Sequence, residues 1–517
     1  MPDSYTCSTI HVKTSLLSAN FHLIHTVAIH STTPLYQLCH TLSLNKFWLL
    51  NRGYVIFFNH SDWTVVQITV QSNDETHFRK IGSPLPTPPL YIARCSCGPK
   101  PTVTLQVVPS PHREGVRGII QEMGLIKQEN KLITKDYRDQ QEKYWEKREE
   151  MVNRLKCVVR SMDAAWLRYW CCLLLGGLEP RDQKILEDTT THILSSLKIS
   201  LTSHQHLLLQ CLISCPDPDQ RAVSYEGGLT LCLQAGIAAV LGESVRSSRV
   251  KDVYNAVKNE KATLDKLRTA ERNPIILILD KDIVSLPWEM TWVLQNQAVT
   301  RMPSLRMLYI LYQHHSCKSD SVLVKGINPN RAFYVLDPEN NLPRTRKRLE
   351  GILDETGWPG VTAQTPSHEI FKEALSNQDM FVYIGHGSGS KYMPGEIVES
   401  AECRAVVLLY GCSSVGLLPN GQIPDPWGAV MNYLVAYCPC VIGMLWDVTD
   451  KETDMLTMEM LQTMRGLSTA EGTTMENPPS DLPLLVSQAR SKRNWYFSRA
   501  ALSVYGLPLH IAHNFDS

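Results

Sequence analysis

The chain has 517 residues, 43% of them apolar and 20% charged, which is typical of globular proteins with sizeable cores. Lysine plus arginine equals aspartate plus glutamate, 51 each, so the charge balance gives no reason to expect a nucleic-acid or membrane binder. No apolar run approaches the roughly 20 residues that span a bilayer. No signal-peptide pattern precedes the fifteen scattered cysteines, which indicates reduced, intracellular thiols.

Two cysteine pairs have close enough spacing to raise the question of metal ligation. Cys95-Ser96-Cys97 and Cys438-Pro439-Cys440 have one-residue spacers, and neither has a partner pair at zinc-site spacing. Ordinary buried or surface thiols are the better interpretation. The sequence therefore predicts no metal and no other cofactor.

The first hundred residues contain short strand-like runs. Residues 1–45 are polar and irregular and receive no fold assignment, with disorder as one interpretation. Apolar, β-branched runs at 54–58, 63–70 and 102–108 predict strands, and the last alternates with the period of a half-buried strand.

A helical region follows, from about residue 118 to 270. Residues 127–154 are dense in charge and lack glycine and proline, which predicts either one long solvated helix or a two-helix excursion. A partner-binding coiled coil is less favoured, because the apolar positions do not hold a heptad over three repeats. Further helices are expected at 181–197, 228–241 and 250–270.

The second half alternates apolar strands with amphipathic helices. Continuous apolar runs predict buried strands, at 274–280, 331–337, 380–384, 405–410 and 439–446. Helices are expected between the later runs, at 345–356, 368–377 and 427–437. This order predicts an α/β fold with a mostly parallel sheet that is buried on both faces.

Two strand ends carry reactive side chains. Gly385 and His386 follow one apolar run, and Gly411 and Cys412 follow the next. Functional groups collect beyond the carboxyl ends of parallel strands, so we expect both turns at one edge, on neighbouring strands. Gly385 and Gly411 are expected to turn the chain through positive φ.

The pairing of cysteine with histidine points to acyl transfer. Cys412 would attack as a thiolate, and His386 would take its proton and then protonate the leaving amine. The backbone N–H groups of Gly387 and Cys412 could form an oxyanion hole. No acidic third member is evident, and a thiol is acidic enough for a dyad.

Each of these features has a plainer explanation. A histidine in a glycine-rich turn is often a cap or a surface residue, and a cysteine after an apolar strand is often a small core residue. A phosphate loop would need the full Gly-x-x-x-x-Gly-Lys-Ser/Thr pattern, which is absent. The two glycine-flanked strand ends together favour the catalytic dyad.

The motifs resemble a known family. His386-Gly387 followed by Gly411-Cys412-Ser413-Ser414 is similar to the motifs of the caspase-fold (clan CD) cysteine peptidases. The surrounding sequence resembles the separase family. The matching stretches run in family order and are 279–282, 286–289, 298–305, 333–342, 357–358, 383–390, 403–414, 443–453 and 505–508.

The resemblance implies a caspase-like protease domain at 326–517. It also implies a preceding substrate-binding domain at 46–325, which resembles a pseudo-protease and has a helical insert at about 118–270. His386 and Cys412 match the catalytic pair, and the segment 445–450 resembles the region near the primary specificity pocket. Substrate-binding residues are expected among Asp447, Asp450, Trp446 and Ser413. Asp447 is the first candidate to read arginine; Asp450 is the second, with a helix cap as its alternative.

The resemblance further implies an endopeptidase that cuts after arginine, at Glu-x-x-Arg sites in the kleisin subunit of cohesin, in the cytoplasm and nucleus. A securin-like inhibitor is the expected partner, without sequence-specific nucleic-acid or membrane binding. Separases usually carry a long helical-repeat region before these domains, so a short or truncated member is expected. The alternative is a catalytically silent protein that holds a securin-like partner in the same groove.

Overall fold

The computed structural model describes residues 62–70, 87–97, 101–110, 118–136, 140–216, 228–242, 245–420, 423–465, 480–491 and 494–512. Residues 1–45, for which no fold was assigned, and the expected strand at 54–58 lie outside these ranges. Among the described residues, no helix combines the length and the apolar character that a membrane crossing needs.

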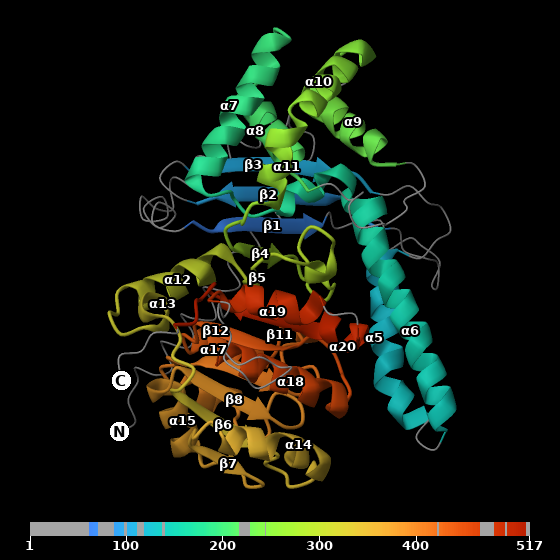
Figure 1. Cartoon of the computed structure of the whole chain (residues 1–517). Helices are drawn as coiled ribbons and strands as arrows, with labels where there is room; N and C mark the ends of the chain where they lie inside the picture. Colours follow the sequence, from blue (N-terminus) through green and yellow to red (C-terminus); the bar gives the residue numbers. More distant parts are fainter. Residues whose placement is uncertain are drawn as a thin grey trace.

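One large sheet organises the molecule, as Figure 1 shows. Its eleven strands lie in the order β3-β2-β1-β4-β5-β13-β12-β9-β8-β6-β7. Neighbours are parallel except for the pairs β1–β2, β2–β3 and β12–β13. The strands are β1 (Thr64–Val70), β2 (Leu90–Ser96), β3 (Thr102–Val108), β4 (Ile275–Leu279), β5 (Val299–Arg301), β6 (Ala332–Leu336), β7 (Gly360–Thr362), β8 (Met380–Ile384), β9 (Val406–Tyr410), β12 (Cys440–Met444) and β13 (Leu502–Gly506). A separate hairpin joins β10 (Leu418–Asn420) and β11 (Ile423–Trp427).

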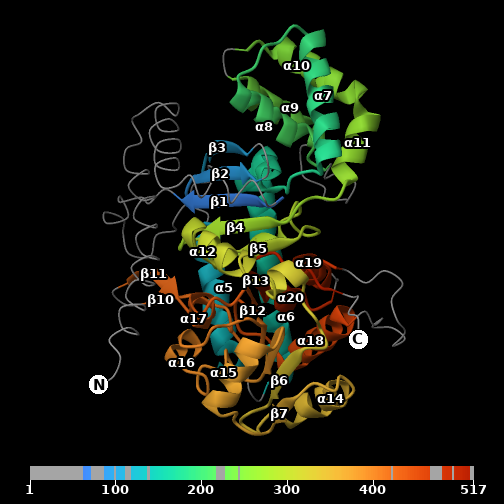
Figure 2. The same cartoon turned by 90° about the vertical axis from the view of Figure 1, so that its left-hand side faces the viewer.

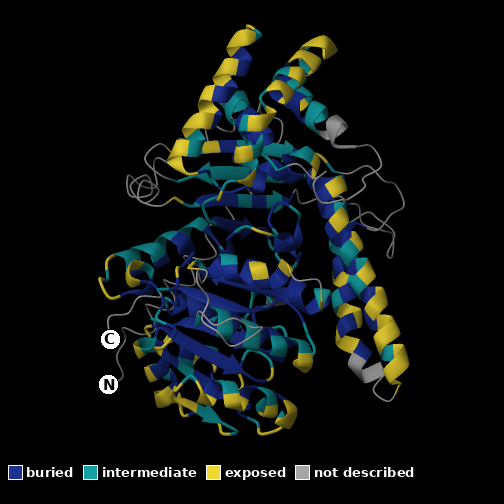
Figure 3. Cartoon of the chain, in the orientation of Figure 1, coloured by how far each residue is buried: buried dark blue, intermediate teal, exposed yellow. Residues whose placement is uncertain are grey.

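The central strands are buried on both faces. All five residues of β4, β8, β9, β12 and β13 are buried, as Figure 3 shows in dark blue. Such strands read as continuous apolar runs, which is why the sequence located the first four. The predicted α/β class with a mostly parallel sheet is confirmed.

Helices cover both faces of the second half. Figure 2 shows α12 (Leu305–Ser316), α15 (His368–Asn377), α16 (Gly395–Glu399) and α17 (Ala429–Val435) on one face of the sheet. On the other face lie α14 (Pro343–Asp354), α18 (Asp450–Met464), α19 (Leu482–Ser491) and α20 (Tyr496–Ala501). The short α13 (Val322–Lys325) follows α12.

The helices between β3 and β4 form two groups. α7 (Pro180–Ser196), α8 (Ser203–Ile213), α9 (Gly228–Leu241), α10 (Ser247–Asn259) and α11 (Lys261–Thr269) gather beyond β3 (Figure 1). The second group consists of α5 (Ile119–Asp136) and α6 (Gln141–Ser161). Residues 127–154 therefore form the two-helix excursion, not one long helix. They run down beside α20, and α6 contacts it.

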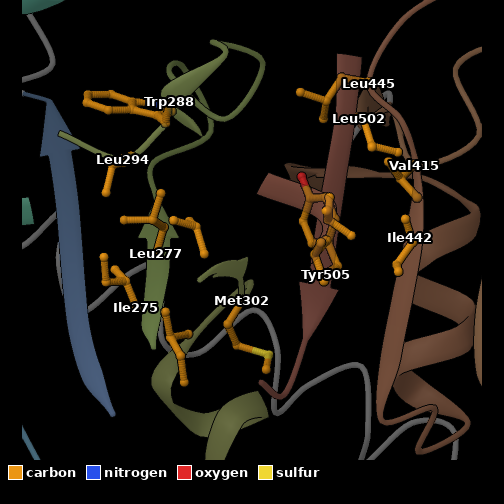
Figure 4. Close-up of a cluster of buried hydrophobic side chains, with 14 of the residues drawn as sticks. Ile275, Leu277, Trp288, Leu294, Met302, Val415, Ile442, Leu445, Leu502 and Tyr505 are labelled. Atoms are coloured by element: carbon orange, nitrogen blue, oxygen red, sulfur yellow. The ribbon is translucent and has the colours of Figure 1, made fainter. Parts of the chain in front are cut away.

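A single core continues through the junction between β5 and β13. Figure 4 shows Leu277, Trp288 and Met302 on one side of it, and Ile442 and Tyr505 on the other. β5 and β13 pair in parallel there, with Tyr505 opposite Arg301. Strands from both sides of residue 325 thus share one sheet, and the domain boundary placed there stays a prediction.

A buried ion pair lies at this junction. The Arg301 guanidinium donates from Nε to Glu289 Oε1 at 2.7 Å and from the second terminal nitrogen to Glu289 Oε2 at 2.6 Å. Ser503 of β13 donates to the same carboxylate at 3.2 Å. Glu289 and Arg301 are 2% and 1% exposed. Burial acts to raise the pKa of Glu289, but the charge and hydrogen bonds of Arg301 together hold this pKa below its ordinary value, so the pair is ionised.

Candidate active site

The two turns that carry the predicted dyad lie at one edge of the sheet. β8 and β9 pair in parallel with Ile384 opposite Tyr410, so their carboxyl ends are level. His386 follows β8 after one glycine, and Cys412 follows β9 in the same way. The expectation of neighbouring strands and a common edge is confirmed.

The glycines make this closeness possible, although not through the conformation that we expected. A Cβ on Gly411 would lie 2.0 Å from the Gly387 carbonyl oxygen and 2.5 Å from that of Gly385. Positive φ belongs instead to Gly387, at 60°, and to Gly389, at 75°. The prediction of positive φ at Gly385 and Gly411 is wrong. Gly411 is needed because backbone carbonyls pack where its side chain would be.

His386 is exposed and has a side-chain partner. Its Nε2 lies 3.0 Å from Asn341 Oδ1, and the Tyr383 hydroxyl donates to the His386 carbonyl at 2.9 Å. Asn341 Nδ2 donates in turn to Glu339 Oε2 at 2.9 Å, and Lys391 pairs with Glu339 at 3.0 Å. In the tautomer with Nε2 as donor, Nδ1 keeps the lone pair that a thiol proton needs.

Asn341 was missed from the sequence. It lies 45 residues before His386, in the loop that follows β6. β6 pairs with β8 in parallel, with Leu336 opposite Ile384, so the loop opens at the same edge. The strand-end rule that found His386 and Cys412 would also have pointed to this loop, but no motif there marks which side chain reaches the histidine.

If His386 serves the dyad that the sequence predicts, Asn341→Ala should lower kcat for peptide cleavage roughly 10- to 100-fold, because the imidazole loses the group that fixes its orientation. KM should change much less. Asn341→Asp keeps an oxygen acceptor for Nε2 but loses the bond to Glu339 and sets two carboxylates side by side, so it should recover only part of the rate. Steady-state kinetics on the three proteins make the comparison, and equal losses in both variants would contradict an orienting role.

Cys412 is half-buried, and its thiol donates to the Val448 carbonyl, with Sγ and oxygen 3.3 Å apart. Burial raises the pKa of the Cys412 thiol above its ordinary value, the Asp447 and Asp450 carboxylates add to this, and the Arg148 charge opposes it. The thiol is therefore neutral here, and its use as a nucleophile requires a base.

Asp447, the first candidate for binding the substrate arginine, is hydrogen-bonded to Ser413, the residue that follows Cys412. Ser413 Oγ donates to Asp447 Oδ1 at 2.5 Å, and the Ser413 backbone N–H donates to the Trp446 carbonyl at 3.2 Å. Ser413 has φ of 53°, which is uncommon for a residue with a side chain. These two bonds hold it in that conformation and fix Asp447 beside the Cys412 turn.

The other two predicted substrate contacts lie differently. Asp450 is exposed and is the first residue of α18, with Thr449 as the N-cap, so it occupies a helix start close to the place that the alternative interpretation gave it. The Trp446 side chain is buried against Phe497 and donates from Nε1 to its carbonyl at 3.2 Å. In this structure it supports the site from beneath and is not available for a substrate contact.

The two backbone N–H groups of the expected oxyanion hole are available to a substrate. Among the described residues, no acceptor pairs with the backbone N–H of Gly387 or Cys412. Apart from Gly387 and its two chain neighbours, no heavy atom of the described residues lies within 4 Å of the place where a Gly387 Cβ would be, so the space in front of this turn is open. The oxyanion role of the two groups stays a prediction.

An α/β sheet with cysteine and histidine turns at one edge is the architecture of a cysteine peptidase class, and the comparisons identify which. The model of the family "Separin, protease domain" matches residues 90–453. Mouse separin is 30% identical over 415 residues, which cover 80% of this chain and 18% of that protein. Separin of Schizosaccharomyces pombe is 33% identical over 270 residues, covering 51% and 14%.

Solved structures agree in fold. Two structures of the Saccharomyces cerevisiae separase–securin complex match with a TM-score of 0.67 each. One is 20% identical and covers 87% of this chain and 30% of that one; the other is 19% identical and covers 92% and 32%. The chain belongs to the separin family of cysteine proteases, through its protease domain. It spans less than a fifth of the length of the curated relatives it matches.

Proposed function

We propose that the chain is a separase-type cysteine endopeptidase, which cuts after arginine in Glu-x-x-Arg sites of the kleisin subunit of cohesin and so releases sister chromatids at anaphase. The observation that supports the proposal is the packing of Gly411 on the carbonyls of Gly385 and Gly387, which brings together the two turns that carry Cys412 and His386. Family membership supports it, and this role would place the chain in the cytoplasm and nucleus.

In the proposed reaction, His386 takes the proton of Cys412 as the sulfur attacks the scissile carbonyl carbon. The N–H groups of Gly387 and Cys412 stabilise the oxyanion. The imidazolium then protonates the leaving amine, and water activated by His386 hydrolyses the thioester. Asp447 receives the arginine side chain before the cut, since a carboxylate matches the guanidinium fork.

The test is cleavage of a purified cohesin kleisin fragment by the wild-type chain and by Cys412→Ser. We expect new termini directly after arginine with the wild type, and no cleavage with Cys412→Ser at an unchanged melting temperature. Cys157→Ser removes an exposed thiol on α6 and is the matched control, with wild-type cleavage expected. Cleavage by Cys412→Ser would remove Cys412 from the reaction.

A second candidate is a catalytically silent protein that holds a securin-like partner in the same groove. Two observations favour it: the solved relatives were captured with securin, and burial raises the pKa of Cys412 in this structure. An arginyl acyloxymethyl ketone discriminates, because it alkylates a working thiol. Labelling of Cys412 supports the peptidase; a folded chain that stays unlabelled but binds securin supports the silent protein.

A further inference from the structure

The α5–α6 hairpin reaches the candidate active site from the other half of the chain. Arg148 on the inner face of α6 is 5% exposed. Its guanidinium lies 4.1 Å above the Phe497 ring and 3.7 Å from the Glu452 carboxylate. Lys156, farther along the helix, approaches the Tyr496 ring at 5.5 Å. The hairpin is therefore packed on α18 and α20, not only solvated.

Two consecutive hydrogen bonds connect this arginine to the segment 445–450, which carries Asp447. Arg148 donates to Asn130 Oδ1 at 2.6 Å, and Asn130 Nδ2 donates to the Asp447 carbonyl at 2.9 Å. Asn130, on α5, is 5% exposed. Val448, the next residue, accepts the Cys412 thiol. The hairpin thus holds the backbone of the segment that carries the candidate arginine reader and contacts the nucleophile.

Packing alone does not explain a charge at this place. Burial lowers the pKa of the Arg148 guanidinium, and Glu452 opposes this from 3.7 Å, which is too far for a direct hydrogen bond. An apolar side chain of similar volume commonly serves a buried helix face at least as well. What an apolar residue cannot do is orient Asn130 with its amide donor towards Asp447.

We infer that Arg148 and Asn130 are positioning residues, which hold the Asp447 backbone so that its carboxylate meets the substrate arginine and Val448 meets Cys412. The inference rests on the proposed function and deepens it, because it makes the helical hairpin part of the specificity machinery. Arg148 acts through Asn130 and does not contact the substrate.

The first experiment compares kcat/KM for peptides with arginine or lysine before the cut. Asn130→Asp keeps the acceptor for Arg148 but replaces the N–H donor with a carboxylate oxygen, so it breaks the bond to Asp447 and adds one negative charge beside Arg148. We expect the arginine-to-lysine preference to fall roughly 5- to 10-fold in Asn130→Asp and Arg148→Met, mostly through KM. Arg148→Lys can still donate to Asn130 and should recover part of it.

The matched control is Arg154→Met. Arg154 is on the same helix and pairs with Glu122 at 2.7 Å and Glu129 at 2.5 Å, inside the hairpin, without touching the site. It should lose hairpin stability and keep the arginine preference. An unchanged preference in Asn130→Asp and Arg148→Met, or an equal fall in Arg154→Met, overturns the inference while leaving the proposed function intact.

The second experiment needs no turnover and therefore holds even for an inactive chain. Iodoacetamide alkylation of Cys412, followed by peptide mass mapping against pH, reports its titration. Three described groups act on this thiol by charge, namely Asp447, Asp450 and Arg148 of α6; Tyr144 of α6 is near enough for the Cys412 charge to raise the pKa of its phenol. With His386 across the turn unchanged, Arg148→Met should move the profile to higher pH. Asn130→Leu, which alters no charge but breaks the bond that holds the segment 447–448, should also move it, and Arg154→Met should not. Identical profiles overturn the inference.

Discussion

Gly411→Ala should lower the rate of catalysis about 100-fold in a chain that still folds. A methyl group there would lie 2.0 Å from the Gly387 carbonyl oxygen and 2.5 Å from that of Gly385, and both neighbours are backbone. The turns that carry His386 and Cys412 must then separate. A displacement near 1 Å of reacting groups costs about 100-fold in rate, and the strain costs roughly 1–3 kcal/mol of stability.

Peptide cleavage and the melting temperature together test this. Gly124→Ala in α5 is the control, because no heavy atom lies within 4 Å of its Cβ position and alanine favours a helix. Gly387→Ala meets no atom but has φ of 60°, so strain of about 1–2 kcal/mol is expected there without a clash. Wild-type activity in Gly411→Ala would show that the two turns do not depend on each other.

Glu289→Gln should be the most destabilising of the variants considered. It leaves the Arg301 charge buried without a counter-ion and turns an amide donor towards a guanidinium donor. Breaking one partner of a buried pair typically costs about 3–5 kcal/mol. Because Ser503 of β13 donates to the same carboxylate, the loss falls on the strand that joins both halves of the sheet.

Urea unfolding measures the loss. Glu129→Gln is the control, since its side chain is 49% exposed and its pair with Arg154 should contribute under about 1 kcal/mol. The double variant Glu289→Gln/Arg301→Met should recover part of the stability by removing the orphaned charge. A loss below about 1 kcal/mol in Glu289→Gln would contradict a structural role for the pair.

The parts of the fold that the sequence predicted are those with one dominant signal. β4, β8 and β9 are buried on both faces and therefore read as apolar runs, and His386 and Cys412 each follow such a run after a glycine. β13 was missed because Ser503 interrupts its apolar pattern; the buried hydroxyl is satisfied because it donates a hydrogen bond to Glu289, which is far away in the sequence.

The rest of the site depends on contacts that no local pattern encodes. Residues 127–154 read as a solvated helical region because charged side chains dominate them. Yet Asn130 and Arg148 are buried there, since the hairpin lies against α18 and α20. Asn341 could not be predicted for the same reason, because its hydrogen bond to His386 depends on β6 and β8 being neighbours in the sheet. Tertiary placement, not composition, decides what these polar residues do.

The position of β13 in the sheet also bears on how the chain is made. β13 lies between β5 and β12, yet among the strands that the structure describes it comes last in the sequence. Roughly 200 residues separate β5 from β13, so on a ribosome the edge of β5 waits roughly 10–40 s for its neighbour. An unpaired edge is a template for aggregation, which makes β5 a natural point of chaperone dependence during synthesis. The two halves of the sheet are joined, and the hydrogen bond from Ser503 to Glu289 forms, only after β13 has emerged.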